Sequence, residues 1–252
     1  MQERRRKHQS MVAALTLALI LGGAVFYMTY MPNKSWSGEL PPLTAEQAEI
    51  ADRLRRHIQV LAADIGERNV WREDTLETAA EYIETALQAA GYAVSSQVFS
   101  AQATGVRNLE AILEGHSPAD DIVVIGAHYD TVPGSPGAND NGSGVAALLE
   151  IARLLAGDPL ARSVRFVAFV NEEAPFFYTR EMGSYRYADR ARERGEKISA
   201  MLSLETIGYY ADARGSQRFP NPVYAWFYPD TANFIGFVGN LKSRRLVRRC
   251  LG

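Results

Sequence analysis

The chain has a single cysteine, Cys250, among its 252 residues. No disulfide can therefore form within it, and its stability cannot depend on one. Histidine is also scarce, with four residues, none of which lies beyond His128. We find no internal repeat and no low-complexity segment. What remains is an ordinary globular composition, 47% hydrophobic and 22% charged, in a chain long enough for one or two domains with a sizeable core.

A strong excess of charge of either sign is also lacking, because the net charge is only −2. The charge is unevenly distributed. Residues 1–34 carry five of the 27 basic residues and one of the 29 acidic residues, so the rest of the chain is acidic. This balance argues against a nucleic-acid-binding protein, and it does not by itself favour any other partner.

The one long apolar run lies at the N-terminus. Basic residues Arg4–Lys7 precede the uncharged residues 9–33, whose apolar centre is 11–30. About 20 apolar residues span a bilayer, and basic residues before the span predict a cytoplasmic N-terminus with the remainder outside. A cleaved signal peptide is the alternative, but residues 27–32 offer no good small-residue cleavage site. A soluble core helix fits poorly because the run has no polar face.

The sequence thus predicts a basic cytoplasmic N-terminus at 1–10, a transmembrane signal anchor at 11–31, a linker at 32–43 and a folded domain at 44–252. Prolines and Gly38 indicate the linker. Thr44 and Gln47 have the spacing of a capping box, which predicts that a helix begins there. The folded domain would lie outside the cytoplasm, in the periplasm or the extracellular space.

The folded domain has the alternating strands and helices of an α/β protein. Ser143 is the best candidate for the cap of the helix at 144–155. The strands before the polar loops are nearly continuously apolar, which is typical of a buried, largely parallel sheet whose carboxyl ends form a ligand crevice. Helices are predicted near 45–65, 75–90 and 144–155, and strands near 93–99, 106–113, 122–127, 164–170 and 198–202.

Polar side chains follow three of these strands. One imidazole and several carboxylates at successive strand ends suggest a Zn²⁺ site. Adjacent residues in an extended chain point in opposite directions, so one glutamate of a pair could bind metal while the other faces a water molecule. The residues concerned are His128 and Asp130 after the strand at 122–127, Asp140 in the next loop, Glu172 and Glu173 after 164–170, and Glu205 after 198–202.

Each of these residues also has a plainer explanation. A lone His-x-Asp pair is more often structural, and Asp130 can reach His128 only if the loop turns back. Asp140 could form an Asx-turn or cap the next helix. Glu205 follows an apolar strand and needs a cation or hydrogen-bond donors. Taken together in this order, the residues are far more specific than any one of them.

His128-Tyr-Asp130, the loop Pro136–Gly144, Asn171-Glu-Glu173 and Gly183-Ser184 resemble the motifs of the co-catalytic di-zinc aminopeptidases. This metallopeptidase family includes bacterial leucyl aminopeptidases, and its relatives include glutamate carboxypeptidases and glutaminyl cyclases. The resemblance covers the chain from about Leu54 onward. It implies a mixed, mostly parallel central sheet sandwiched by helices, so that residues 44–252 would be a zinc peptidase domain.

The resemblance also implies the role of each residue. Two zinc ions would be bridged by Asp140, one held also by His128 and Glu205, the other by Glu173. Glu172 would be the general base, and Asp130 would bind His128 from behind the metal. The Asp140–Asn141 peptide bond would be cis. These roles agree with the chemistry of two-metal hydrolases, in which a bridging carboxylate holds ions about 3.5–4 Å apart.

Two departures from the family pattern stand out. The position of Glu205 is commonly Asp. More seriously, the family has a further histidine ligand on the zinc that Glu173 serves, well downstream, and this chain has no histidine there. The chain ends shortly after residues 241–250, which look like the start of an amphipathic helix. A truncated chain is the favoured explanation because the catalytic acids are intact, and a degenerate, non-catalytic member is the alternative.

Three functional classes follow from these observations. The first is a membrane-anchored zinc exopeptidase that removes N-terminal residues from peptides. The second is a glutaminyl cyclase-like acyltransferase that uses a single zinc ion. The third is a non-catalytic membrane protein that keeps the peptidase fold. The expected partners are peptide substrates and, through the N-terminal helix, a membrane, but not nucleic acid.

Overall fold

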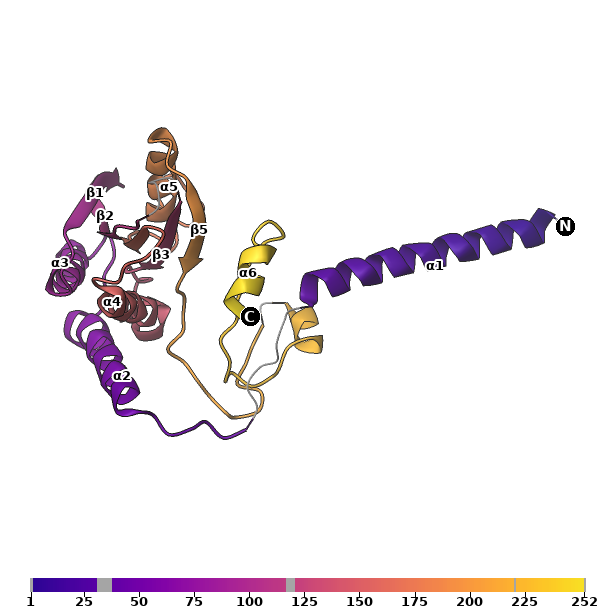
Figure 1. The fold of residues 1–252 in the computed structure, drawn as a ribbon, viewed down its shortest axis with the longest axis horizontal. Coiled ribbons are helices and arrows are strands. Elements are labelled where there is room, and N and C mark those ends of the chain that lie inside the picture. Colours follow the sequence, from indigo (N-terminus) through magenta and orange to yellow (C-terminus); the bar gives the residue numbers. More distant parts are fainter. Residues whose placement is uncertain (1, 31–37, 117–120, 220, 252) are drawn as a thin grey trace. The chain divides into compact units, whose positions relative to one another are not determined.

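The computed structural model describes residues 2–30, 38–116, 121–219 and 221–251 of the chain (Figure 1). The chain divides into two compact units. One consists of Met1–Leu40 together with Phe234–Gly252, and the other of Pro41–Asn233. Residues 32–37 of the expected linker lie outside the described residues.

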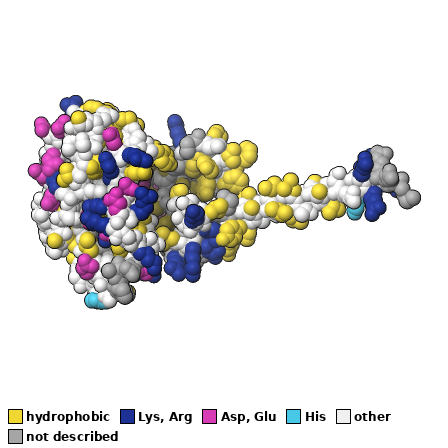
Figure 2. Space-filling model, turned by 90° about the horizontal axis from the view of Figure 1, so that it is seen from above, with side chains coloured by type: hydrophobic (Ala, Val, Ile, Leu, Met, Phe, Trp, Pro, Cys, Tyr) yellow, Lys and Arg dark blue, Asp and Glu magenta, His cyan; other side chains and the backbone are white. Residues whose placement is uncertain are grey.

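The first unit contains α1 (Gln2–Thr29) and α6 (Arg244–Leu251). Residues Arg4–Tyr27 of α1 form a helix long and apolar enough to cross a membrane, and none of its most apolar window is buried. Figure 2 shows hydrophobic side chains along α1 and basic side chains near its N-terminal end. The predicted N-terminal apolar helix is therefore present. A membrane anchor and a signal sequence both meet this criterion of length and composition.

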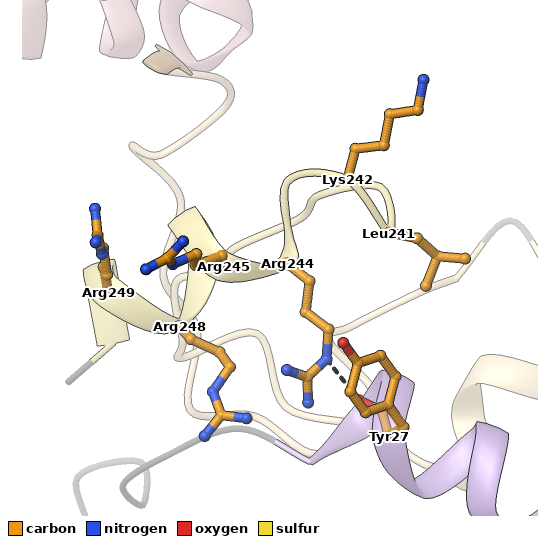
Figure 3. Close-up of a pocket in the computed structure, with 7 residues that line it drawn as sticks. All are labelled: Tyr27, Leu241, Lys242, Arg244, Arg245, Arg248 and Arg249. Atoms are coloured by element: carbon orange, nitrogen blue, oxygen red, sulfur yellow. Dashed lines mark hydrogen bonds between the residues drawn. The ribbon is translucent and has the colours of Figure 1, made fainter. Parts of the chain in front are cut away.

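Helix α6 contacts the end of α1 through Arg244. Its Nε donates to the carbonyl oxygen of Tyr27 at 2.6 Å (Figure 3). Its Nη2 donates to the carbonyl oxygen of Tyr30 at 3.0 Å. The last carbonyls of a helix have no partner within the helix, so the guanidinium satisfies two groups that would otherwise need water. The expected helix near the end of the chain is thus confirmed over Arg244–Leu251.

The second unit is built on a five-stranded sheet with the order β1-β2-β4-β3-β5. β3 pairs in parallel with β4 and β5, whereas β2 pairs antiparallel with β4 and β1. Among these strands only β2 therefore runs in the opposite direction, which confirms the expected mixed, mostly parallel sheet. The strands are β1 (Val94–Ala101), β2 (Thr104–Leu113), β3 (Ile122–His128), β4 (Val164–Phe169) and β5 (Ile198–Ser203).

Helices pack on both faces of this sheet, as expected. α3 (Glu73–Ala89) and α4 (Gly144–Leu155) bury residues such as Leu87 and Leu148 against one face. α5 (Gly183–Glu193) places Tyr187 against the other face, beside Val124 and Val167. α2 (Ala45–Ile58) contacts α4 and continues as a wider helical turn over Gln59–Ile65.

The helix ends follow the sequence with one exception. The capping box at α2 is formed, with Gln47 donating its amide to Thr44 Oγ1 at 3.2 Å. The prediction that Ser143 caps α4 is wrong, because Ser143 already has helical backbone angles. Its hydroxyl instead donates to the carbonyl of Asn139 at 2.7 Å. Asn141 takes the capping role, and its Oδ1 accepts the Gly144 amide at 3.1 Å.

Candidate metal centre

The strand register places the candidate residues at one edge of the sheet. His128 is the last residue of β3 and lies opposite Phe169 of β4, while Gly126 lies opposite Ser203 of β5. Because these three strands run in parallel, the loops after them leave the sheet at the same edge. The loop after β4 carries Glu172 and Glu173, and the chain after β5 carries Glu205.

One group at this edge consists of His128, Asp140 and Glu205, whose ligating atoms all lie within 4.8 Å of one another. His128 Nε2 is 3.2 Å from Asp140 Oδ1 and 3.4 Å from Glu205 Oε2. The carboxylates therefore face the same ring nitrogen from two different loops. The Asp140–Asn141 peptide bond is cis, as the resemblance implied.

Asn141 connects these two loops, a role that the sequence did not reveal. Its Nδ2 donates to Glu205 Oε2 at 3.2 Å and to the carbonyl of Leu204 at 2.9 Å. Its Oδ1 accepts the amide of Thr206 at 3.2 Å. The buried side chain of Asn141 thus holds the loop of Glu205 next to the loop of Asp140.

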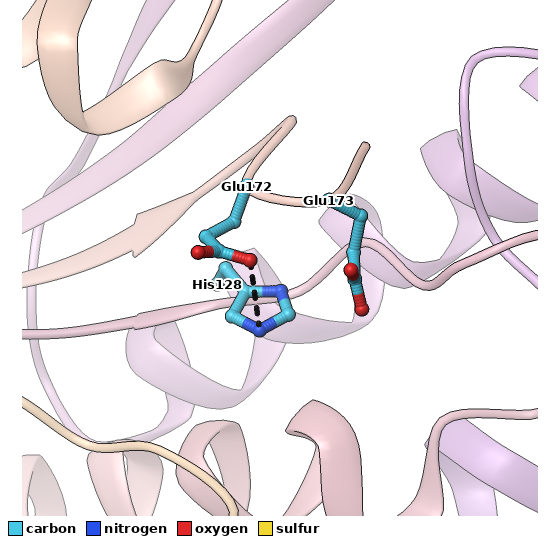
Figure 4. A group of neighbouring side chains, drawn as sticks. All are labelled: His128, Glu172 and Glu173. Carbon is cyan, nitrogen blue, oxygen red and sulfur yellow. Dashed lines mark ion pairs between the residues drawn. The ribbon is translucent and has the colours of Figure 1, made fainter. Parts of the chain in front are cut away.

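A second group contains His128, Glu172 and Glu173, again with ligating atoms within 4.8 Å of one another. Figure 4 shows both glutamates projecting from one loop toward the level of the imidazole, and His128 Nε2 is 3.8 Å from Glu172 Oε2. The strand-like alternation expected for adjacent residues does not apply here. β4 has ended at Phe169, and Asn171 has a positive φ of 58°, so the loop no longer has extended geometry.

Asp130 holds the glutamate loop as well as the histidine. Its Oδ1 lies 3.3 Å from His128 Nδ1, so the loop turns back as this contact requires. Its two carboxylate oxygens also accept the backbone amides of Glu172 and Glu173, each at 3.1 Å. Asp130 is 2% exposed. A buried carboxylate therefore connects the ends of β3 and β4 directly behind the candidate ligands.

The electrostatics of the site favour a bound cation. His128 is buried, and its ring nitrogens lie at ion-pair distance from carboxylates, yet neither has a hydrogen bond of good geometry. Burial alone lowers the pKa of His128, but hydrogen-bonding distance to Asp130, Asp140 and Glu205 outweighs it and raises that pKa far above its usual range. The carboxylates thus stabilise positive charge on or next to the ring.

On the two glutamates, burial and neighbouring acids both raise the pKa. Burial, followed by the charge of Asp140, raises the pKa of Glu173 to about 7. Burial likewise raises the pKa of Glu172, and the nearby acids add to this effect. A bound metal ion would stabilise the ionised form of these carboxylates, because its positive charge would offset their mutual repulsion.

The donor set fits zinc. An imidazole nitrogen and carboxylate oxygens are ordinary zinc ligands, and three protein ligands leave one position for water. Nε2 of His128, which is buried without a hydrogen bond and faces Asp140 and Glu205, also needs a partner that a metal ion would supply. His57 is not part of the site, because its Nδ1 lies 2.7 Å from the hydroxyl of Tyr82.

Comparison with known proteins agrees with the fold and identifies the family. Residues 108–225 match peptidase family M28. The chain is 37% identical over 223 residues to the uncharacterized protein YfbL of Escherichia coli (strain K12), covering 85% of this chain and 67% of that protein. It is 45% identical over 124 residues to aminopeptidase YwaD of Bacillus subtilis (strain 168), covering 46% of this chain and 26% of that protein.

Solved structures share the fold. The zinc aminopeptidase BSAP from Bacillus subtilis superposes with a TM-score of 0.57 at 17% identity, covering 66% of this chain and 71% of that chain. The Porphyromonas gingivalis glutaminyl cyclase gives a TM-score of 0.54 at 25% identity, covering 71% and 66%. These proteins thus share the mixed, helix-flanked sheet of this chain. The chain belongs to peptidase family M28.

Proposed function

We propose that this chain is a metal-dependent exopeptidase that hydrolyses N-terminal peptide bonds. The observation that carries the proposal is His128, a buried imidazole whose ring nitrogens lack hydrogen bonds and which is surrounded by acids from three loops. Membership of family M28 supports the same class of activity.

Each residue has a defined part in this proposal. His128, Asp140 and Glu205 would hold one zinc ion, and Asp140 would share its carboxylate with a second ion held by Glu173. Bound zinc lowers the pKa of a water ligand toward neutrality and polarises a carbonyl oxygen. Asp130 keeps the imidazole oriented from the Nδ1 side.

Glu172 is the proposed general base. Its carboxylate lies beside the centre, and its raised pKa brings it closer to the neutral range in which a base works best. It takes a proton from the attacking water and delivers it to the amine that leaves. No other part of the chain has to supply a nucleophile in this scheme.

The second ion has fewer ligands in this chain than the first. Glu173 and the shared Asp140 are its only proposed ligands, because no histidine follows His128 in the sequence. The proposal therefore predicts unequal affinities for the two ions.

We further propose that α1 anchors the protein in a membrane with the peptidase domain outside the cytoplasm, in the periplasm or the extracellular space. The basic residues Arg4–Lys7 ahead of the apolar helix support this orientation, and the poor cleavage site after it supports an uncleaved anchor.

A glutaminyl cyclase-like acyltransferase is the second candidate. The three ligands of the first group would be sufficient for a single zinc ion, as such an enzyme would need. The similarity to the Porphyromonas gingivalis glutaminyl cyclase points in the same direction.

Two activity assays on the purified chain, supplied with excess zinc, distinguish the exopeptidase from the acyltransferase. Release of the chromophore from an aminoacyl anilide supports the exopeptidase. Cyclisation of an N-terminal glutaminyl peptide, with loss of ammonia and no anilide hydrolysis, supports the acyltransferase. Glu172→Gln is the control in both, and an activity that survives this change does not belong to the proposed site.

A further inference from the structure

Arg68 lies in the segment between the turn Gln59–Ile65 and α3, and its side chain is completely buried, with 0% exposed. It is the largest fully buried side chain among the described residues. The hydrogen bonds recorded for its guanidinium all go to backbone carbonyls and none to a carboxylate. The acceptors are Tyr129 at 2.6 Å, Pro136 at 2.8 Å, Leu61 at 3.0 Å, Gly66 at 3.0 Å and Gly137 at 3.1 Å.

Three of these carbonyls belong to the loops of the candidate metal centre. Tyr129 stands between His128 and Asp130. Pro136 and Gly137 begin the turn that carries Asp140. One guanidinium therefore bonds both the loop that presents the imidazole and the loop that presents the proposed bridging carboxylate.

The backbone of Arg68 binds the first of these loops as well. Its amide donates to Thr131 Oγ1 at 3.1 Å, and its carbonyl accepts the Thr131 amide at 2.9 Å. Arg68 is thus fixed at both its main chain and its side chain, so a shift of the guanidinium would have to move the loop after β3.

Gly137 packs directly against the guanidinium of Arg68. Gly137 has a positive φ of 61°, and a Cβ there would lie 2.2 Å from Thr131 Cγ2 and 3.1 Å from Arg68 Nη2. The glycine lets its own carbonyl approach the guanidinium. The loop before Asp140 can therefore pack directly on Arg68.

The side chain remains charged in this environment. Burial lowers the pKa of Arg68 to about 10, and the negative charge of Asp130 opposes that decrease. A buried cation without a hydrogen-bonded carboxylate is costly unless its donors are satisfied. The planar fork of arginine can bond carbonyls on several sides at once, which the single nitrogen of lysine cannot do.

We propose that Arg68 is a positioning residue for the metal centre, which sets the separation of His128 and Asp140 by bonding the loops on which they lie. The inference rests on the metal site described under the proposed function. Arg68 itself touches neither metal nor substrate in this scheme.

Arg68→Lys in the full chain tests the proposal. The affinity for Zn²⁺ is measured by competition with a chelating dye, under conditions where circular dichroism shows the protein folded. Substitution of a residue that orients metal ligands typically costs 10- to 100-fold in metal affinity, and we expect a loss of about that size. Arg68→Met should lose at least as much, because it removes the donors as well as the charge.

Leu87→Ala is the matched control, since it removes a fully buried side chain of α3 and neither proposed ligand nor loop contact. It should lower stability to urea without changing the zinc affinity of the folded protein. If Arg68→Lys does not fold, Thr131→Val replaces it. That variant removes the acceptor of the Arg68 amide, and about a fivefold loss of affinity is expected.

The outcomes are distinct. Unchanged zinc affinity in Arg68→Lys, or in Thr131→Val where that variant is used, overturns the positioning role and leaves the metal site standing. An equal loss of affinity in Leu87→Ala also overturns it, because the effect would then reflect stability alone. If the unsubstituted chain binds no zinc, the proposed metal site fails and this inference fails with it.

Discussion

Asp130→Asn should be among the most damaging conservative changes in the protein. The two carboxylate oxygens of Asp130 accept the amides of Glu172 and Glu173, each at 3.1 Å, and one of them also faces His128 Nδ1. An asparagine has only one acceptor oxygen, so its NH₂ group would face a backbone N–H and leave that donor unpaired in a buried position.

The size of the effect follows from these contacts. A buried donor left without a partner costs about 1–3 kcal/mol, and the loss of a charge-assisted bond at the second amide adds to this cost. We expect a decrease of roughly 2–4 kcal/mol in the free energy of unfolding. Zinc affinity should fall by about 10- to 100-fold, because the imidazole and the glutamate loop lose their common support.

Urea unfolding and a zinc competition assay on the same preparations measure both quantities. Asp189→Asn is the control, because it makes the same chemical change at a surface ion pair with Arg192, 3.1 Å away. Such exposed pairs contribute about 0–1 kcal/mol. If Asp130→Asn lowers the free energy of unfolding no more than Asp189→Asn does and binds zinc normally, Asp130 does not support the imidazole and the glutamate loop as described.

Three further predictions concern the acids and the anchor. Glu172→Gln should leave zinc content unchanged and lower turnover of an aminoacyl anilide by a factor of about 10² or more, and loss of zinc from this variant would exclude a pure base role. In protein freed of metal by a chelator, the raised pKa of Glu173, about 7 against 4.5, means that the folded state binds the proton more tightly. Its stability should therefore fall as pH rises from about 4.5 to 7, by no more than about 2 kcal/mol after solvent screening, and Glu173→Gln should remove this slope. In cells that express the full chain, the protein should fractionate with membranes, and a soluble product with a new N-terminus near Pro32 would instead indicate a signal peptide.

Local sequence pattern was sufficient to predict the strands and to place the candidate site residues at or just after their ends. The apolar runs at 122–127, 164–170 and 198–202 correspond to β3, β4 and β5, and helix 144–155 has the bounds expected for α4. The residues His128, Glu172 and Glu205 could be grouped because parallel strands bring their carboxyl ends to one edge. That rule needs no knowledge of side-chain packing.

Contacts between distant segments could not be predicted in this way. The sequence favours Ser143 as the cap of α4, whereas in the structure Asn141 accepts the Gly144 amide and also the amide of Thr206 from the chain after β5. Arg68 carried no signal either, since a single arginine in a loop is normally exposed. Three of its five acceptors, Tyr129, Pro136 and Gly137, are distant in the sequence and approach Arg68 only in the folded chain.

Metal analysis of the dialysed 252-residue chain, beside His128→Ala, tests the central claim most directly. We predict about one tightly bound zinc ion per chain, held by His128, Asp140 and Glu205, and its loss in His128→Ala. Two retained zinc ions would mean that a residue of this chain replaces the downstream histidine of the family. Absence of zinc from the unsubstituted chain, or full retention in His128→Ala, would contradict the account.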